Sequence, residues 1–252
     1  MGALHEGHLR LVRQAKRECR RVVVSIFVNP LQFGPGEDFK RYPRDLKGDL
    51  EKLRREKVDC VFVPSAKGLY PAEYQTSVSV EKLSKPLCGK FRPGHFQGVA
   101  TVCAKLFNVV EPDRAYFGEK DFQQLRIIEQ LVKDLNLDIR IRRHPIVREK
   151  DSLAMSSRNR YLSPIERKEA TVLFQTLSRG REAIRRGERR TDAITRLMRQ
   201  TIRPLKRIRV DYLTVVDPKD LSSSRRLKDQ VLLAGAIRIG RTRLIDNILV
   251  KC

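Results

Sequence analysis

The chain begins with MGALHEGH, in which two histidines stand three residues apart. This spacing places His5 and His8 on one face of the first turn of a helix. The same turn presents unpaired backbone N–H groups and the positive end of the helix dipole, and both favour an anion. Gly7 adds no side chain that would cover the backbone between the rings. The pattern predicts a phosphate cradle with two imidazole donors; the alternatives are two surface histidines, or a zinc site for which only two ligands are visible.

A second polar cluster follows the apolar run VVVSIFV, where a buried strand would end. The Asn29-Pro30 pair stops ladder pairing, because proline has no backbone N–H. Gln32 then lies at the carboxyl end of the strand, where open α/β sheets bind ligands. Its amide both donates and accepts, which suits a small hydroxy-carboxylate better than a phosphate. The next residues, Pro35-Gly36, predict a loop that could cover this site, although an ordinary turn after a strand has the same composition.

The stretch AYFGEKDFQQL forms a third cluster at a strand end. Gly118 permits a close backbone approach, Lys120 brings a positive charge, and Asp121 can accept from ribose hydroxyls. Gln124 follows Lys120 by one helical turn. A solvated lysine is the plain alternative, but the position at the end of a strand favours a ligand site.

The stretch AMSSRN forms a fourth cluster. Ser156, Ser157 and Arg158 place two hydroxyls and a guanidinium side by side, a combination suited to phosphate oxygens. Serines are also common in turns and caps, which is the alternative interpretation.

The elements that position these clusters alternate between helix and strand patterns. The first half predicts a helix from His5, a strand over 22–28, a helix over 45–56, a strand over 58–64, a helix over 96–110, a strand over 113–118, a helix over 123–135 and an extended segment over 138–147. Such alternation indicates an α/β fold with a doubly wound, Rossmann-like parallel sheet.

The pattern changes near Ile146. A polar loop is followed by predicted helices over 166–187 and 192–202 and by strands over 209–218, 230–240 and 241–250, the last two joined at Gly240 as a hairpin. We therefore expect two domains: residues 1–146, which bind nucleotide and small acid, and residues 147–252, a smaller C-terminal α+β lid domain.

The composition limits the classes of protein to which the chain can belong. The 252 residues carry a formal net charge of +23, with twelve basic and three acidic residues between Arg179 and Arg209. Such charge fits a nucleic-acid binder, but there is no tryptophan and no known nucleic-acid motif, so we expect a solvated arginine-rich surface and no nucleic-acid partner.

No run is long and apolar enough to span a membrane, and no secretory signal is visible. The five cysteines include no C-x-x-C pair, which indicates reduced thiols. These features predict a cytoplasmic protein without a membrane partner.

Taken together and in this order, the clusters resemble the pantoate–β-alanine ligase (pantothenate synthetase) family of the nucleotidyltransferase superfamily. The similarity spans essentially the whole chain and rests on MGALHEGH, FVNPLQF, RPGHFQGVATV, KLFN, YFGEKDFQQL, AMSSRNRYLS and RLIDN. The resemblance implies a two-step ligation. Pantoate attacks the α-phosphate of ATP to give pantoyl adenylate and pyrophosphate, and β-alanine then attacks the activated carbonyl and releases AMP.

The resemblance also implies roles for individual residues. His8, His5 and Lys120 would be catalytic, with His8 as proton donor; Gln32 would bind pantoate and β-alanine, and Gln124 pantoate. Met155–Arg158 would close over the phosphates like the mobile loop of class I aminoacyl-tRNA synthetases. The implied nucleotide-binding residues are Met1, Gly2, Ala3, Leu4, His5, Glu6, Gly7, His8, Gly118, Glu119, Lys120, Asp121, Val147, Met155, Ser156, Ser157 and Arg158. Mg²⁺ and a homodimer are implied as well, but no metal ligands are identified.

One departure concerns the start of the chain. Members of the family carry a further segment before the position of Met1, including a strand that enters the His-x-Gly-His turn. We expect either that this strand precedes the sequence given, or that the sheet lacks its first strand and the cradle is poorly anchored. The first is favoured, because the loss of a buried strand exposes apolar area worth about 25 cal/mol per Å².

Three other functions remain as alternatives: an adenylyl- or cytidylyltransferase that activates a different acid, a fragment of a tRNA synthetase, and an RNA-binding protein without activity. Gln32 and Gln124 argue against the first, no anticodon-binding region follows for the second, and salt-sensitive RNA binding would indicate the third.

Overall fold

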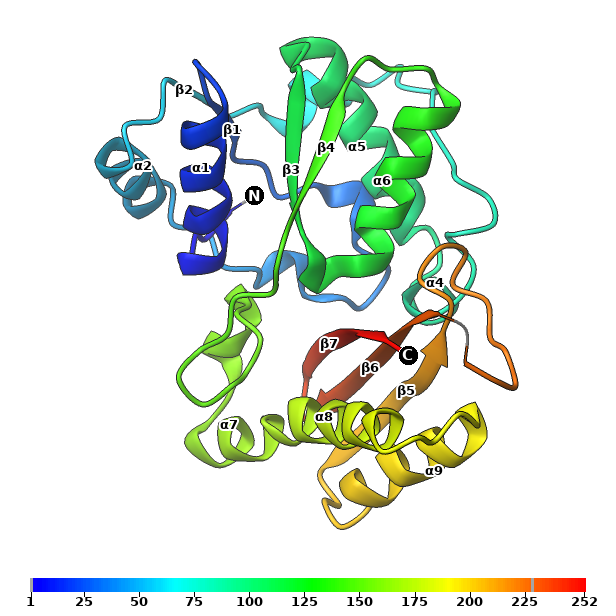
Figure 1. Cartoon of the computed structure of the whole chain (residues 1–252). Helices are drawn as coiled ribbons and strands as arrows, with labels where there is room; N and C mark the ends of the chain where they lie inside the picture. The colour runs from blue at the N-terminus through cyan, green and yellow to red at the C-terminus, as the bar shows by residue number, and fades with distance from the viewer. Residues whose placement is uncertain (1, 228) are drawn as a thin grey trace. The chain divides into compact units, whose positions relative to one another are not determined.

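The computed structural model describes residues 2–227 and 229–252, and the chain forms two compact units (Figure 1). The first unit comprises Met1–Lys85, Arg92–Glu119 and Gln123–Ile146. The second comprises Pro86–Phe91, Lys120–Phe122 and Val147–Cys252. Lys120 and Asp121 are thus grouped with the C-terminal residues, although they directly follow a strand of the first unit.

The first unit contains parallel strands that alternate with helices. β1 (Val23–Ser25) pairs with β2 (Cys60–Phe62), and β3 (Arg114–Gly118) pairs with β4 (Arg140–His144), in both cases in parallel. The principal helices are α1 (Glu6–Glu18), α2 (Leu46–Arg55), α5 (His95–Val110) and α6 (Phe122–Asp134). The short elements are η1 (Pro30–Gln32), η2 (Asp38–Lys40) and α3 (Ala66–Leu69). A further short element, η3 (Glu119–Asp121), begins in the first unit, and its last two residues belong to the second. This confirms the predicted α/β class. Within the described residues the parallel strands form two separate pairs, with no ladder joining them.

The strand expected over 22–28 is shorter and less buried than its apolar composition suggests. Its ladder covers Val23–Ser25 and is extended by the N–H of Ile26, which donates to the carbonyl of Phe62 at 2.9 Å. Val22 and Val24 are buried, but Val23 is 42% exposed. The expectation of a buried strand was therefore wrong for one of its faces: only the alternate side chains on the other face contact the core, which also contains Leu4 and Leu53.

The second unit is an antiparallel sheet covered by two helices. β5 (Ile208–Val216), β6 (Gln230–Ile239) and β7 (Thr242–Lys251) form the sheet in that order. α8 (Val172–Arg185) packs on β6 and β7, and α9 (Thr191–Ile202) packs on β5 and on α8. Gly240, with a φ of 53°, makes the tight turn between β6 and β7, as predicted. The smaller elements of this unit are α4 (Cys88–Phe91), η4 (Ser157–Tyr161) and α7 (Pro164–Ala170).

The helix predicted over 166–187 is two helices. α7 ends at Ala170 and α8 begins at Val172. The hydroxyl of Thr171 donates to the carbonyl of Lys168 at 2.9 Å, a local bond of the kind that competes with regular helix geometry. The apolar periodicity continues across the break, which is why the sequence pattern does not reveal it.

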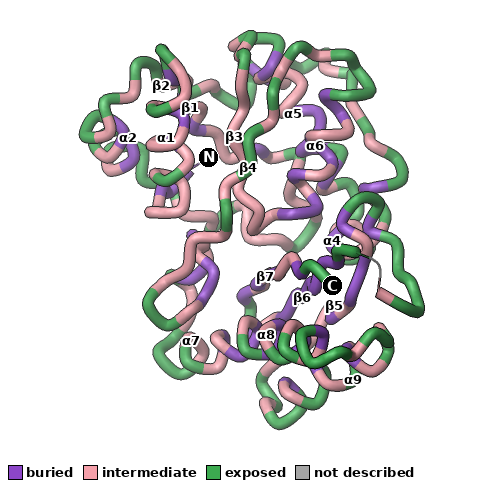
Figure 2. Tube along the Cα trace, viewed as in Figure 1, coloured by how far each residue is buried: buried purple, intermediate pink, exposed green. Residues whose placement is uncertain are grey.

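Burial is concentrated in β6 and its neighbours and in α6 (Figure 2). Leu125, Ile127 and Ile128 of α6 are fully buried, and so are Leu233 and Ile237 of β6. In the part of the chain that the structure describes, no helix combines the length and apolar character needed to cross a membrane.

α5 packs against η1 at a glycine. A Cβ atom added to Gly98 would lie 2.2 Å from the carbonyl oxygen of Leu31 and 2.7 Å from the backbone nitrogen of Gln32. These are backbone atoms, which cannot rotate away as a side chain does. The helix can therefore approach the Gln32 turn this closely only without a side chain at position 98.

We predict that Gly98→Ala destabilises the protein by about 1–3 kcal/mol, because the methyl group displaces η1. In an unobstructed helix interior the same change stabilises by about 1 kcal/mol. The sign of the stability change therefore shows whether a side chain at position 98 is obstructed. Urea denaturation of the parent and the variant measures it. Gly34→Ala serves as control, because nothing lies within 4 Å of the Cβ position at Gly34. A Gly98→Ala protein as stable as the parent would contradict the packing.

Candidate active site

The two histidines of MGALHEGH lie together at the start of α1. His5 is the N-cap residue, with an extended φ of −129°, and His8 is the third residue of the helix. Their rings are stacked, with centroids 3.9 Å apart and an angle of 24° between the planes. The N–H of His5 donates to Nδ1 of His8 over a long 3.4 Å. Both residues are half-buried, so the structure places two imidazoles at the positive end of a helix dipole.

The backbone that leads into this turn is fixed by α2. The N–H of Leu4 donates to Oδ1 of Asp49 at 2.6 Å, and Nζ of Lys52 donates to the carbonyl of Leu4 at 3.0 Å. The side chain of Asp49 is only 1% exposed. Ala3 adopts a left-handed φ of 49°, which is uncommon for a residue with a side chain. Asp49 and Lys52 thus hold both polar groups of the residue next to this unusual conformation.

The predicted nucleotide residues around the histidines are not equivalent. Ala3 and Leu4 are buried in the core, and both backbone polar groups of Leu4 are already bonded to Asp49 and Lys52. Glu6 is ion-paired with Arg10 at 3.0 Å and with Arg13 at 2.5 Å. Met1 lies outside the described residues.

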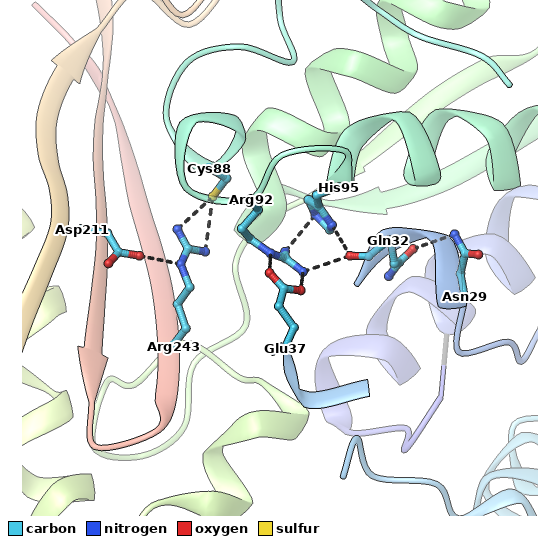
Figure 3. A network of polar contacts seen from close by, with 8 residues as sticks. All are labelled: Asn29, Gln32, Glu37, Cys88, Arg92, His95, Asp211 and Arg243. Carbon is cyan, nitrogen blue, oxygen red and sulfur yellow. Dashed lines mark hydrogen bonds and ion pairs between the residues drawn. The ribbon is translucent and has the colours of Figure 1, made fainter. Parts of the chain in front are cut away.

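The turn that carries Gln32 is held by a buried asparagine. Asn29, 2% exposed, accepts from the N–H of Leu31 at 3.2 Å and from the hydroxyl of Tyr70 at 2.9 Å through Oδ1. Its Nδ2 donates to the carbonyl of Gly98 at 3.0 Å and to Oε1 of Gln32 at 3.3 Å. Asn29 therefore ties the backbone of η1, its glutamine side chain and α5 to one another. Figure 3 shows the contact between Asn29 and Gln32.

An arginine from the segment before α5 reaches the same turn. Arg92 forms two hydrogen bonds of 2.7 Å with the carboxylate of Glu37 and donates to the carbonyl of Gln32 at 3.2 Å. Nδ1 of His95 lies 2.7 Å from that carbonyl, and its Nε2 lies 2.9 Å from the guanidinium of Arg92 (Figure 3). The predicted covering loop thus has a defined anchor at Glu37.

The third cluster lies at the end of β3. Gly118 is the last residue of the strand, and the space around its Cβ position is open within 4 Å. Nζ of Lys120 lies 3.6 Å from Oδ1 of Asp121, and the two side chains are 21% and 48% exposed. Gln124, on α6, is half-buried, while its neighbour Gln123 is buried and donates to the carbonyl of Leu83 at 2.8 Å. Gln123 is therefore structural, and Gln124 is the more exposed of the two glutamines.

The fourth cluster belongs to the second unit, where Val147 and Met155 are neighbours. The N–H of Met155 donates to the carbonyl of Val147 at 3.0 Å, and Arg148 pairs with Ala154 as an isolated bridge. Ser156 caps η4 by accepting from the N–H of Arg158 at 3.3 Å. Ser157 is buried and only 5% exposed. Ser156 thus has the capping role that was its alternative interpretation, and this role leaves the Arg158 side chain half-exposed.

The terminal RLIDN motif has contacts inside the second unit. The guanidinium of Arg243 donates to Oδ2 of Asp211 at 2.8 Å and lies 3.6 Å from Sγ of Cys88 (Figure 3). Asp246 pairs with both terminal nitrogens of Arg148 at 2.7 and 3.0 Å. Nδ2 of Asn247 donates to the carbonyl of Lys120 at 3.0 Å. The motif therefore orders the backbone at Lys120 and beside Val147.

Sequence reasoning missed the residues that hold these turns: Asn29, Glu37, Asp49, Arg92 and His95. Arg92 and His95 belong to the RPGHF string, which stood out only through the family resemblance. Asp49 gives no such signal, because an aspartate in an amphipathic helix is ordinarily solvated.

The Glu37–Arg92 pair gives the fold a dependence on pH. Burial opposes ionisation of Glu37, but the hydrogen bonds and charge of Arg92, aided by the backbone of Gly34, outweigh it and lower the pKa of the carboxyl. A lowered pKa contributes stability that is present above the unfolded value of about 4.3 and is lost as pH falls through the folded value.

We therefore predict that the stability difference between the parent and Glu37→Gln is constant above about pH 6 and shrinks as pH falls below about 4. Urea titrations between pH 3 and 8 measure it. A difference that does not change down to the acid end of this range would contradict the assigned ion pair.

Comparisons with known proteins agree with the motifs. The family model described as Pantoate-beta-alanine ligase matches residues 1–249. The pantothenate synthetase of Syntrophomonas wolfei is 52% identical over 252 residues, which are 100% of this chain and 89% of the relative. That of Caldicellulosiruptor saccharolyticus is 53% identical over 251 residues, with the same two coverages.

Solved structures give the same result. A pantothenate synthetase from Thermus thermophilus superposes with a TM-score of 0.96 at 47% identity, covering 98% of this chain and 90% of that one. A pantoate-beta-alanine ligase from Francisella tularensis, solved with Beta-gamma ATP and Beta-alanine, gives 0.79 at 34% identity, with coverages of 99% and 87%. Because the family model matches residues 1–249 of this chain and the relatives are about half identical to it, the chain is an enzyme that belongs to the pantoate-β-alanine ligase family.

Proposed function

We propose that the chain joins pantoate to β-alanine with ATP, through a pantoyl adenylate, and releases AMP and pyrophosphate. The observation that supports this most directly is the stacked His5–His8 pair at the N-terminus of α1, in a chain of this family. The Francisella tularensis relative, whose structure holds Beta-gamma ATP and Beta-alanine, supports the identity of two substrates.

The first step needs charge neutralisation more than covalent chemistry. Transfer at phosphorus proceeds by positioning the groups and stabilising charge on the phosphate oxygens. We assign His5 and His8, with the backbone N–H groups of α1, to the triphosphate of ATP. His8 donates a proton or hydrogen bond to the charge that develops as pyrophosphate leaves.

The acid is assigned to the two glutamines. A glutamine amide can donate to the carboxylate and hydroxyl oxygens of pantoate and accept from its hydroxyls. Gln32 is the last residue of η1 and is fixed by Asn29, and Gln124 is half-buried on α6. Gln32 also contacts β-alanine in this proposal, so that the amine meets the activated carbonyl.

The remaining predicted residues are assigned to the nucleotide. In this assignment Gly118, Glu119 and Asp121 bind the adenosine and Lys120 binds phosphate. Val147 and Met155–Arg158 complete the set of nucleotide-binding residues. A pantoyl adenylate is protected from hydrolysis when water is excluded from the site.

Magnesium enters this proposal as part of the substrate. Among residues 2–227 and 229–252, no group of three or more His, Cys, Asp and Glu side chains could hold a metal ion. Mg²⁺ in nucleotide sites is held mainly by phosphates and water, with one or two carboxylates. The residues present therefore fit Mg²⁺ bound to ATP, where it supplies further charge neutralisation, and they do not form a separate protein cage. A cytoplasmic homodimer completes the proposal and is supported by the family resemblance alone.

The proposed function predicts AMP formation that requires ATP, pantoate and β-alanine together. Omission of β-alanine should leave pantoate-dependent exchange of pyrophosphate into ATP, because the first step is independent of the amine. Chromatography of nucleotides and a labelled exchange assay measure the two steps. Exchange with other acids but not with pantoate would instead favour a nucleotidyltransferase of different specificity.

We predict that His8→Ala lowers the pyrophosphate exchange rate about 10²–10³-fold, because one preorganised donor to the phosphates is lost. The folded state should persist, since His8 is half-buried on the first helical turn. His144→Ala is the matched control: this histidine ends β4, and its Nδ1 lies 2.8 Å from the carbonyl of Pro145. Exchange by His8→Ala at the rate of the control would refute the role of His8.

A further inference from the structure

Arg92 contacts both ends of one loop. The loop begins at Gln32, whose carbonyl accepts from Arg92 at 3.2 Å. It ends at Glu37, whose two carboxylate oxygens each accept from Arg92 at 2.7 Å (Figure 3). One guanidinium therefore closes the segment of residues 32–37 into a ring, which we call the Arg92 clasp.

The clasp is well shielded from solvent. The side chains of Arg92 and Glu37 are 12% and 22% exposed. A guanidinium that binds a carboxylate through two nitrogens holds it in a fixed plane, which a lysine cannot do. The contact therefore restrains the direction of the loop, and it also neutralises the charge of Glu37.

His95 adds a second bond to the same carbonyl, and its chemistry fixes the tautomer. A carbonyl oxygen only accepts, so Nδ1 of His95, 2.7 Å from the carbonyl of Gln32, carries the proton. A guanidinium only donates, so Nε2, 2.9 Å from Arg92, is the acceptor. The carbonyl of Gln32 therefore receives hydrogen bonds from two side chains, those of Arg92 and His95.

Taken with Asn29 and Gly98, these contacts fix Gln32 from several sides. The backbone is held at its carbonyl, the glutamine Oε1 accepts from Asn29 at 3.3 Å, and α5 is in contact at Gly98. Within the described part of the chain, no residue accepts a hydrogen bond from Nε2 of Gln32, so this donor is available to a ligand.

We propose that Glu37, Arg92 and His95 are positioning residues for the acid subsite, which orient Gln32 toward pantoate by holding its backbone and closing the loop that follows it. This inference rests on the proposed function. It assigns no substrate contact to the three residues themselves. Displacement of a substrate-binding group by about 1 Å can cost about 10²-fold in rate, so the clasp matters even at a distance from the reacting atoms.

The test is a comparison of the Michaelis constants for pantoate and for ATP. In Glu37→Gln and Arg92→Lys, KM for pantoate should rise about tenfold, while KM for ATP stays within about twofold of the parent value. Hydrogen exchange of the backbone amides of residues 33–37 should accelerate in the same variants. The double variant should be no worse than the more impaired single variant, because the two side chains act as one unit.

Glu129→Gln is the matched control. Glu129 also binds an arginine through two nitrogens, Arg143, at 2.6 and 2.8 Å, and its side chain is 17% exposed. It lies on α6 and has no bond to the Gln32 loop. This variant reports what the loss of a comparable ion pair does to stability and to kinetics in general.

The outcomes separate the two proposals. A parent chain that forms no AMP with pantoate and β-alanine overturns the proposed function, and with it the role of the clasp. An active parent whose Glu37→Gln variant keeps its KM for pantoate, or shows the same changes as Glu129→Gln, overturns the clasp alone. A selective rise in KM for pantoate, with faster exchange at residues 33–37, supports it.

Discussion

The carboxylate of Asp49, a buried residue of α2, holds the backbone from which the histidine turn starts. It accepts from the N–H of Leu4 at 2.6 Å, and Lys52 donates a hydrogen bond to the carbonyl of the same residue. The left-handed Ala3 beside it costs conformational energy that local sequence does not offset. The stacked imidazoles at the start of α1 therefore depend on an anchor from a helix more than forty residues further along the chain.

The Gln32 turn is held by the same kind of interaction. Backbone groups beyond the end of a strand have no ladder partner, and the fold supplies side chains to satisfy them. Asn29 belongs to the turn and accepts from the N–H of Leu31 within it. Arg92 and His95, just before and at the start of α5, contact the carbonyl of Gln32. In both places a polar side chain distant in sequence determines where a candidate functional residue lies.

This explains what sequence could and could not predict. The helix at His5, the strand that ends at Gly118 and the hairpin at Gly240 follow from local rules of capping, periodicity and backbone freedom, and the structure has all three. The roles of Asp49 and Arg92 depend on contacts with residues 45 and 60 positions away, which no local pattern encodes. The exposure of Val23 and the break at Thr171 were missed for a related reason. An apolar periodic pattern does not show which other elements pack on each face of a strand or helix.

The family strings consequently mix two kinds of residue. In MGALHEGH the imidazoles are accessible while the side chains of Ala3 and Leu4 are buried, and in RLIDN the polar side chains bind Asp211, Arg148 and the backbone of Lys120. A match to such a string is thus evidence for a backbone path as much as for a set of reacting groups. If every residue of a motif is assigned to substrate, the number of groups that touch it is overstated. The residues that fix the backbone path, such as Arg92 and Asn247, act on substrate only through the positions of others.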